Sequence, residues 1–252
     1  MSSNVLFVFE GKRAEPNIAR NLRETILERD SKIVVQTSYG MNIYNLFNKI
    51  TIDEYFNTYE FIVQELNQKQ DLTDDDIAVM GIEDPDDISE IYLFFDYDCH
   101  CSNADDEKIR QMVELFNDAQ DKGLLCVSYP MVEAIRHQRG HEPEYLTHST
   151  TDLRSYKTWV NAAPEIDKQF QNWGLYTLET WVSITKQHLS RVHFLLTDSL
   201  ELPTEPVCML EVFERQMDKH RPDNEVAVIS GFPMMLLDHY GKDTFNVLEI
   251  DS

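Results

Sequence analysis

Short runs of consecutive apolar residues recur along the chain, and most are followed by a turn and a helix-like pattern. These runs occupy residues 5–9, 33–35, 91–95, 124–127 and 226–229. An unbroken apolar run of this length is typical of a strand that is buried on both faces of a sheet. Between the runs, apolar residues spaced by four, as at Ile18, Leu22 and Ile26, indicate amphipathic helices. The alternation predicts an α/β fold, with a mostly parallel sheet flanked by helices.

Helical patterns fill most of the segments between these runs. They predict helices at residues 17–29, 43–50, 55–70, 109–116, 207–219 and 234–240. Pro130 suits the first turn of a further helix, which would place Ser128 near its N-cap and Glu133 in its first turn. The charge run within residues 71–90 is interpreted as a solvated loop ahead of the run 91–95.

The pattern changes from about residue 145 onward, where long helical stretches contain Trp159, Trp173 and Trp181. These tryptophans could stack nucleic-acid bases, but helical spacing in an acidic protein favours a core or a partner interface. We therefore expect three parts: a metal-binding core at 1–150, a helical insertion or cap at 151–222, and a final strand and helix at 223–252 that return to the core.

Composition indicates a globular protein with one sizeable core, because 42% of the 252 residues are hydrophobic. No apolar run approaches the roughly 20 residues that a membrane-spanning helix needs. The first residues lack the basic region of a signal peptide, so we expect none. The four cysteines have irregular spacing, which favours a reduced, cytoplasmic setting over a disulfide framework.

The chain is strongly acidic, with 45 acidic and 22 basic residues and a formal net charge of −23. Proteins that bind nucleic acid alone normally carry a large basic face, because neutralising phosphates supplies most non-specific affinity. This composition excludes a large basic face, although a local basic patch is compatible with it. A nucleic-acid substrate would therefore require a metal ion that bridges to phosphate, or a partner that supplies positive charge.

Carboxylates follow two of the apolar runs directly. Asp96 and Asp98 follow the run 91–95, and Glu10 follows the run 5–9. In an extended segment residues i and i+2 point the same way, so the two aspartates would face one spot at the edge of the sheet. Like charges held together need a counter-charge, and a hard cation such as Mg²⁺ supplies it. The alternative is that Asp96 begins a turn and Asp98 caps the next helix.

These motifs together resemble the TOPRIM domain of topoisomerases, bacterial primases and related nucleases. The first motif, Glu10-Gly11-Lys12-Arg13-Ala14-Glu15-Pro16, is similar to that of the RloB-like and OLD-like proteins of bacterial antiphage defence. The stretch Ser128-Tyr129-Pro130-Met131-Val132-Glu133 is similar to a third motif of those proteins. The resemblance covers roughly residues 4–150, and the helical stretch 152–220 is outside it.

The resemblance implies a TOPRIM-like core and a metal-dependent nuclease, using Mg²⁺ (or Mn²⁺) to cleave DNA or RNA. It also implies a role in antiphage defence, with an ATPase as the protein partner. The third motif carries no obvious catalytic lysine, so Arg136 or His137 would have to substitute for it. The sequence leaves open the choice between DNA and RNA, as well as the oligomeric state.

The candidate residues have separate expected roles in such a site. Asp96 and Asp98 would hold the metal, and Glu10 would ligate it or act as a general acid or base. Glu15 and Glu133 are candidates for a second metal. The alternative for Glu15 is a carboxylate that interacts with a helix N-terminus, and the alternative for Glu133 is a simple first-turn acid.

Two other interpretations compete with this one. Cys99-His100-Cys101 suggests zinc, but no matching Cys/His pair completes a tetrahedral site, so His100 is expected at the rim of the metal site. The competing function is a non-catalytic acidic interaction subunit of a larger defence complex. Such a subunit would not need to bind divalent ions at Glu10, Asp96 and Asp98.

Overall fold

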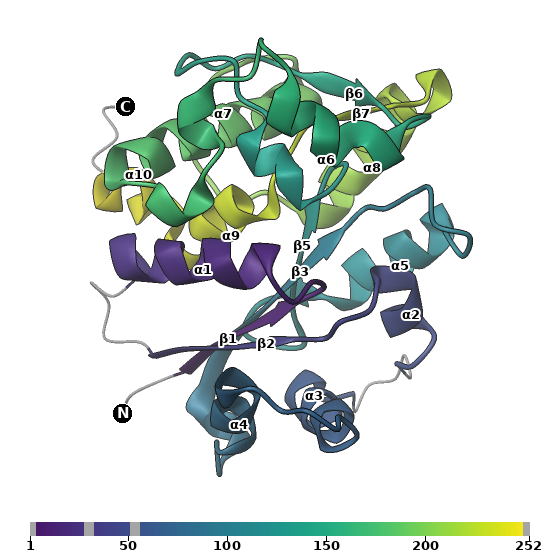
Figure 1. Cartoon of the computed structure of the whole chain (residues 1–252), viewed down its shortest axis with the longest axis vertical. Helices are drawn as coiled ribbons and strands as arrows, with labels where there is room; N and C mark the ends of the chain where they lie inside the picture. Colours follow the sequence, from purple (N-terminus) through teal and green to yellow (C-terminus); the bar gives the residue numbers. More distant parts are fainter. Residues whose placement is uncertain (1–3, 28–32, 51–55, 249–252) are drawn as a thin grey trace.

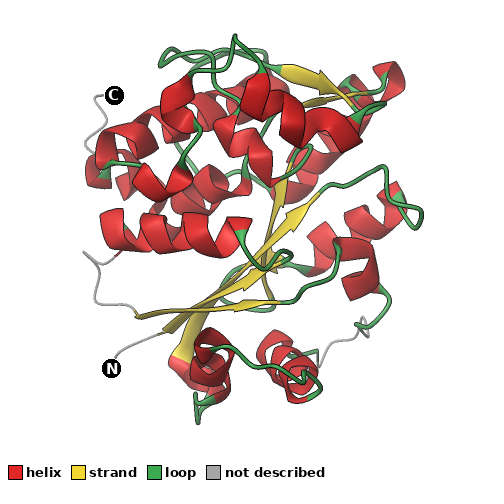
Figure 2. Ribbon diagram, viewed as in Figure 1, coloured by secondary structure: helices red, strands yellow, loops and turns green. Residues whose placement is uncertain are grey.

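A five-stranded, mostly parallel sheet forms the centre of the computed structural model, which describes residues 4–27, 33–50 and 56–248 (Figures 1 and 2). Its strands are β1 (Asn4–Phe9), β2 (Ile33–Ser38), β3 (Ile88–Asp96), β4 (Asn117–Asp118) and β5 (Gly123–Ser128). They lie in the order β2-β1-β3-β5-β4, and only β4 runs antiparallel to its neighbour. The predicted α/β class with a mostly parallel sheet is therefore confirmed.

Helices cover both faces of this sheet. Their bounds are α1 (Ala14–Thr25), α2 (Ile43–Phe47), α3 (Thr58–Asn67), α4 (Asp74–Met80), α5 (Asp106–Leu115), α6 (Leu153–Ala162), α7 (Leu178–Thr197), α8 (Met209–Lys219), α9 (Gly231–Tyr240) and α10 (Thr244–Val247). Helices α1 and α9 lie on one side of the sheet, and α3 and α4 lie on the other (Figure 1). Within the described ranges, no helix is both long and apolar enough to cross a membrane.

Strand β3 is the middle strand of the sheet, and aromatic side chains pack on both of its faces. Phe94 stacks on Phe232 of α9, with ring centroids 4.5 Å apart. The next residue, Phe95, points to the opposite face and lies 6.4 Å from the ring of Tyr39. Alternation of this kind is the period-2 arrangement of a strand covered by helices on both sides. It fixes the end of β3, and therefore Asp96, at one edge of the sheet.

The prediction of a solvated loop at residues 71–90 is wrong in part, because the segment contains helix α4. Thr73 caps this helix and forms a capping box with Asp76. Asp76 is buried and accepts a hydrogen bond from the Thr37 hydroxyl at 2.5 Å, while Lys69 lies 3.2 Å away. The charge run therefore contains both a helix-capping signal and a buried polar anchor. Acidic residues also favour the first turn of a helix through its dipole.

The segment after β5 also differs from the prediction. Ser128 is the last residue of β5, and its hydroxyl accepts a hydrogen bond from the Gly231 amide at 3.2 Å. The Tyr129–Pro130 peptide is cis, and the 3₁₀ helix η3 begins two residues after the proline, spanning Val132–Arg136. Glu133 does lie in the first turn of a helix, as predicted. The predicted helix start at Pro130 and the capping role of Ser128 are wrong.

The remaining predicted helices agree with the structure in position and differ at their ends. Helix α1 begins three residues before the predicted start and ends at Thr25, and residues 28, 29 and 55 of the predicted helices lie outside the described residues. The last strand, β7 (Glu225–Ala227), pairs with β6 (Thr147–Ser149) in a separate antiparallel sheet. Trp181 of α7 is fully buried and donates its indole N–H to the Asn21 side chain of α1 at 2.8 Å.

Candidate metal centre

The carboxyl ends of three adjacent parallel strands bring the candidate carboxylates to one edge of the sheet. Glu10 directly follows β1, Asp96 is the last residue of the neighbouring β3, and Glu133 lies in η3 after β5. The Asp96 amide donates a hydrogen bond to Glu10 Oε2 at 3.1 Å. The Val132 amide donates to Asp96 Oδ1 at 2.8 Å. These two bonds connect the ends of all three strands.

Five residues form what we call the carboxylate centre: Glu10, Glu15, Asp96, Asp98 and Glu133. Asp96 is its electrostatic middle. Burial raises its pKa well above the usual range, and nearby carboxylates raise it further; they are Glu10, Glu15, Asp98 and Glu133. The other four predicted site residues therefore all lie within electrostatic reach of Asp96. Without a cation, a proton on Asp96 is favoured because it removes one charge from a crowded acidic site.

Glu10 responds to the same environment. Burial raises its pKa to about 8, the Asp96 amide opposes this rise, and the charges of Asp98 and Glu15 add to it. A carboxyl group that titrates near neutral pH can both accept and release a proton under physiological conditions. A bound cation would lower this pKa and stabilise the ionised form.

Glu15 lies in the first turn of α1 and turns back toward the β1–α1 turn. Its side chain is buried, and its Oε1 accepts a hydrogen bond from the Gly11 amide at 3.1 Å. A Cβ atom at Gly11 would lie only 2.6 Å from Glu15 Oε2, so glycine leaves the room that this carboxylate occupies. Burial raises the pKa of Glu15, Glu133 raises it further, and Lys157 lowers it. Glu15 therefore fits both expectations, being a helix-terminal acid and a member of the carboxylate group.

Lys157 of α6 is the cation that the sequence did not reveal. Its Nζ lies 2.9 Å from Oε1 of Glu133, whose side chain is 3% exposed, while the lysine side chain is 63% exposed. Helix α6 lies outside the segment that carries the motifs. No spacing rule connects Lys157 to Glu133, because the tertiary packing of α6 against η3 brings them together.

The two residues expected to replace a catalytic lysine have other partners. The Arg136 guanidinium lies 3.3 Å from the centroid of the Trp173 ring and donates to Asn161 Oδ1 at 2.8 Å. His137 is buried beside Tyr156, and burial together with Arg191 lowers its pKa to about 3. This lowered pKa favours the neutral form of His137 at physiological pH, which does not support the expectation that it replaces a lysine.

Asp98 lies near the other carboxylates, but its backbone is not part of the extended strand as expected. Strand β3 ends at Asp96, and Asp98 has a φ of +42°, so the premise that both aspartates lie on one extended segment is wrong. The Cys101 thiol donates to Asp98 Oδ2 at 3.3 Å, and His100 Nδ1 lies 3.6 Å from Oδ1. Asp98 does not cap the next helix either, because Asp105 caps α5.

The cysteine-containing turn does not form the Cys-His-Cys set that suggested zinc. The potential ligand atoms of Asp98, His100 and Cys101 lie within 4.8 Å of one another, whereas Cys99 is outside this group. Burial and the Asp98 carboxylate raise the pKa of the Cys101 thiol to about 11, which favours the protonated form. His100 lies at the rim of the carboxylate group through its contact with Asp98.

The donor chemistry of the central group suits a hard divalent cation. Glu10, Asp96, Glu15 and Glu133 offer only carboxylate oxygens, which are the ligands that Mg²⁺ and Mn²⁺ prefer. Among the described residues, one ion pair joins a cation to this set of four, and it links Lys157 to Glu133. Burial is the main cause of the raised pKa values of Glu10, Glu15 and Asp96, and neighbouring negative charges add to it. Within residues 4–27, 33–50 and 56–248, no three of the four carboxylates have ligand atoms within 4.8 Å of one another, so a metal centre is supported by their charge and donor type.

Comparison of the chain with protein-family models, with curated proteins and with solved structures found no match.

Proposed function

We propose that this chain is a divalent-metal-dependent nuclease that hydrolyses phosphodiester bonds in DNA or RNA. The observation that carries the proposal is the group formed by Asp96 and four neighbouring carboxylates, which gathers where three neighbouring strands end. So much negative charge in a partly buried site favours a bound cation with a net charge of two. Bound Mg²⁺ or Mn²⁺ would neutralise phosphate charge and supply an activated water at neutral pH.

Different residues of the protein would bind the metal and transfer the proton. Asp96 and Asp98 would hold the metal, and Glu15 and Glu133 are available for a second ion. Glu10 would ligate the metal or move a proton to or from the reacting oxygen, a role that suits a carboxyl group with a pKa near 8. Lys157 is well exposed beside Glu133, so its ammonium group can also contact an incoming phosphate.

The TOPRIM-like assignment is part of this proposal. It is supported by the Glu10-Gly11 turn after β1, by Asp96 at the end of the adjacent parallel strand β3, and by Glu133 after β5. The resemblance to RloB-like and OLD-like proteins extends the proposal to bacterial antiphage defence. A net charge of −23 favours work with a partner, and an ATPase is the partner that the resemblance implies.

The test is metal-induced stabilisation followed by a cleavage assay. Mg²⁺ or Mn²⁺ should raise the melting temperature of the wild type and not that of Glu10→Gln/Asp96→Asn. Binding to the folded state alone stabilises by about 2.7 kcal/mol at a metal concentration of a hundred times Kd. The control, Glu83→Gln/Asp218→Asn, removes one glutamate and one aspartate from exposed positions and should keep the full shift.

The cleavage assay separates the nuclease from the competing interaction subunit. With Mn²⁺ present, the wild type and the control should cut labelled DNA or RNA, and Glu10→Gln/Asp96→Asn should not. Equal metal-induced shifts in the wild type and the site variant would reject the metal centre. A scaffold that only binds proteins would show neither the shift nor the cleavage.

A further inference from the structure

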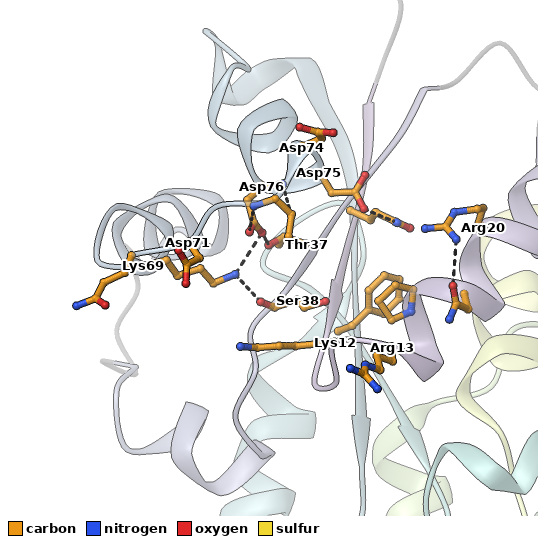
Figure 3. Close-up of a pocket in the computed structure, with 16 residues that line it drawn as sticks. Lys12, Arg13, Arg20, Thr37, Ser38, Lys69, Asp71, Asp74, Asp75 and Asp76 are labelled. Atoms are coloured by element: carbon orange, nitrogen blue, oxygen red, sulfur yellow. Dashed lines mark hydrogen bonds and ion pairs between the residues drawn. The ribbon is translucent and has the colours of Figure 1, made fainter.

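A hollow of about 720 Å³ lies beside the carboxylate centre, between the β1–α1 turn and the segment that joins α3 to α4 (Figure 3). This volume is within the usual range of roughly 300–1,000 Å³ for small-molecule sites. Lys12, Arg13 and Arg20 line it from the side of α1. Exposed aspartates line the opposite side and include Asp74 and Asp75. We call this space the α1 hollow.

The cations of the α1 hollow are available for a ligand. Within the described residues, Lys12 and Arg13 are exposed and form no ion pair, although acidic side chains line the same space. Arg20 donates only to the side-chain oxygen of Asn17, at 3.0 Å. Lys69 is different, because it donates to Ser38 O at 2.7 Å and lies against Asp76.

Three of the 22 basic residues gather on one side of this hollow, in a chain with 45 acidic residues. In the described part of the chain, no ion pair joins the two sides, so their charged groups lie farther apart than the contact of about 4 Å that an ion pair needs. A ligand that fills this width could contact both sides at once. The α1 side would attract negative groups, and the opposite side would repel them and accept hydrogen bonds from donors.

The backbone connects the α1 hollow directly to the candidate metal centre. Lys12 follows Glu10 by two residues, and the Gly40 amide donates to Glu10 O at 3.0 Å. Lys12 lies across Gly40, because a Cβ atom at Gly40 would be 3.0 Å from Lys12 Cε. Gly40 also has a φ of +81°, a conformation that glycine adopts readily. Glycine at position 40 therefore leaves room for the Lys12 side chain to pass beside the end of β1.

We propose that the α1 hollow binds a nucleotide of the substrate strand adjacent to the phosphate that is cleaved. This inference rests on the proposed nuclease function and adds the position of the strand. Backbone phosphates bind Lys12, Arg13 and Arg20, while the base faces Asp74 and Asp75. Repulsion between phosphate and the aspartates fixes this orientation, and base amino groups can donate to the carboxylates. The strand therefore runs along α1 toward Asp96.

The experiment measures binding of a fluorescently labelled single-stranded hexanucleotide at low salt in EDTA, with DNA and RNA versions. Lys12→Gln/Arg13→Gln should weaken binding about tenfold. When the titration is repeated at a second salt concentration, the salt slope should fall by about 1.4, because two phosphate contacts of about 0.7 each are lost. The matched control is Lys168→Gln/Arg215→Gln, which removes one exposed lysine and one exposed arginine elsewhere. This control should bind within about twofold of the wild type, because only long-range repulsion changes.

Three results would overturn the proposal: unchanged binding by Lys12→Gln/Arg13→Gln, equal weakening in the control, or no binding by the wild type at low salt. The metal-induced melting shift of the same proteins, measured without EDTA, separates this failure from that of the nuclease. A normal shift with unchanged binding by Lys12→Gln/Arg13→Gln would reject the α1 hollow alone. No shift in the wild type, with binding still dependent on Lys12 and Arg13, would reject the nuclease alone. A difference between the DNA and RNA probes identifies the substrate class.

Discussion

Lys157 Nζ lies 2.9 Å from Glu133 Oε1, and this ion pair connects the helical segment to the carboxylate centre. The contact joins α6 to η3, two elements that the motif pattern treats separately. Because Glu133 is almost fully buried, its negative charge depends on a nearby cation for stabilisation. The helical segment therefore contributes directly to the electrostatics of the site.

Replacing Lys157 should expose this dependence. Lys157→Gln leaves Glu133 buried without a cation, and we expect the metal-free protein to lose about 1 kcal/mol, since the lysine itself is largely in water. The melting shift caused by Mg²⁺ should become larger, because the metal then relieves more repulsion. Lys168→Gln is the control, as Lys168 is exposed at η4. An unchanged metal shift in Lys157→Gln would show that the pair is independent of the metal centre.

The double variant Asp96→Asn/Asp98→Asn should abolish cleavage and keep the fold. An asparagine oxygen at position 96 can still accept the hydrogen bond from the Val132 amide, so the connection to the β5 loop survives. Removing two negative charges from a crowded site relieves repulsion, and the metal-free melting temperature should hold or rise. Circular dichroism melts and a Mn²⁺ cleavage assay measure the two effects. Unfolding, or full activity, would mean that the pair is structural.

Strand positions and the carboxylates at their ends could be predicted because buried parallel strands have a strong local signature. The runs containing Phe7 and Phe94 predicted β1 and β3, and chain order placed Glu10 and Asp96 after them. Helix α4 was missed because its acidic composition was interpreted as solvation, although Thr73 carried a capping signal. Composition alone does not show that an aspartate such as Asp76 is buried.

The site was predictable in its members and not in its local geometry. The β-strand period placed Asp98 beside Asp96. The strand ends at Asp96, however, and Asp98 itself has a left-handed backbone conformation. Aspartate adopts such a conformation more often than most residues other than glycine, but the i, i+2 rule does not include it. Lys157 was missed because its contact with Glu133 depends on tertiary packing alone.

Gly11→Ala should damage the carboxylate centre more than the fold. The new methyl group would lie 2.6 Å from Glu15 Oε2, so the glutamate must move away from the Gly11 amide. We expect the Mg²⁺-induced melting shift to fall while the metal-free melting temperature changes by a few degrees at most. Gly140→Ala is a matched control, because nothing lies within 4 Å of a Cβ atom at that position. Equal metal shifts in both variants would remove Glu15 from the site.

Acid should destabilise the fold partly through His137. Its pKa is about 3 in the folded protein and about 6.5 when unfolded, so the unfolded state binds more protons between these values. The free energy of unfolding therefore falls as the pH drops from about 6.5 toward 3. His137→Gln should reduce this acid sensitivity in denaturant titrations at pH 7 and pH 5. His193→Gln of α7 is the comparison, and the same pH sensitivity in both variants would contradict the assignment.

The isolated chain should bind nucleic acid weakly and need a basic partner for efficient cleavage. With a net charge of −23, the free surface repels phosphates at long range, and salt screens this repulsion over roughly 8 Å at physiological ionic strength. Rising salt therefore weakens the few phosphate contacts while it also reduces the repulsion, so the net salt slope should be shallow. A titration of nucleic acid with this protein alone, in Mg²⁺ at about 50 mM and 200 mM salt, measures the salt slope. For comparison, a basic groove with 6–10 phosphate contacts would lose about 10³–10⁵ in affinity between these two concentrations. Tight binding with so steep a loss would show that the chain holds a concentrated basic groove, and the need for a partner would lose its basis.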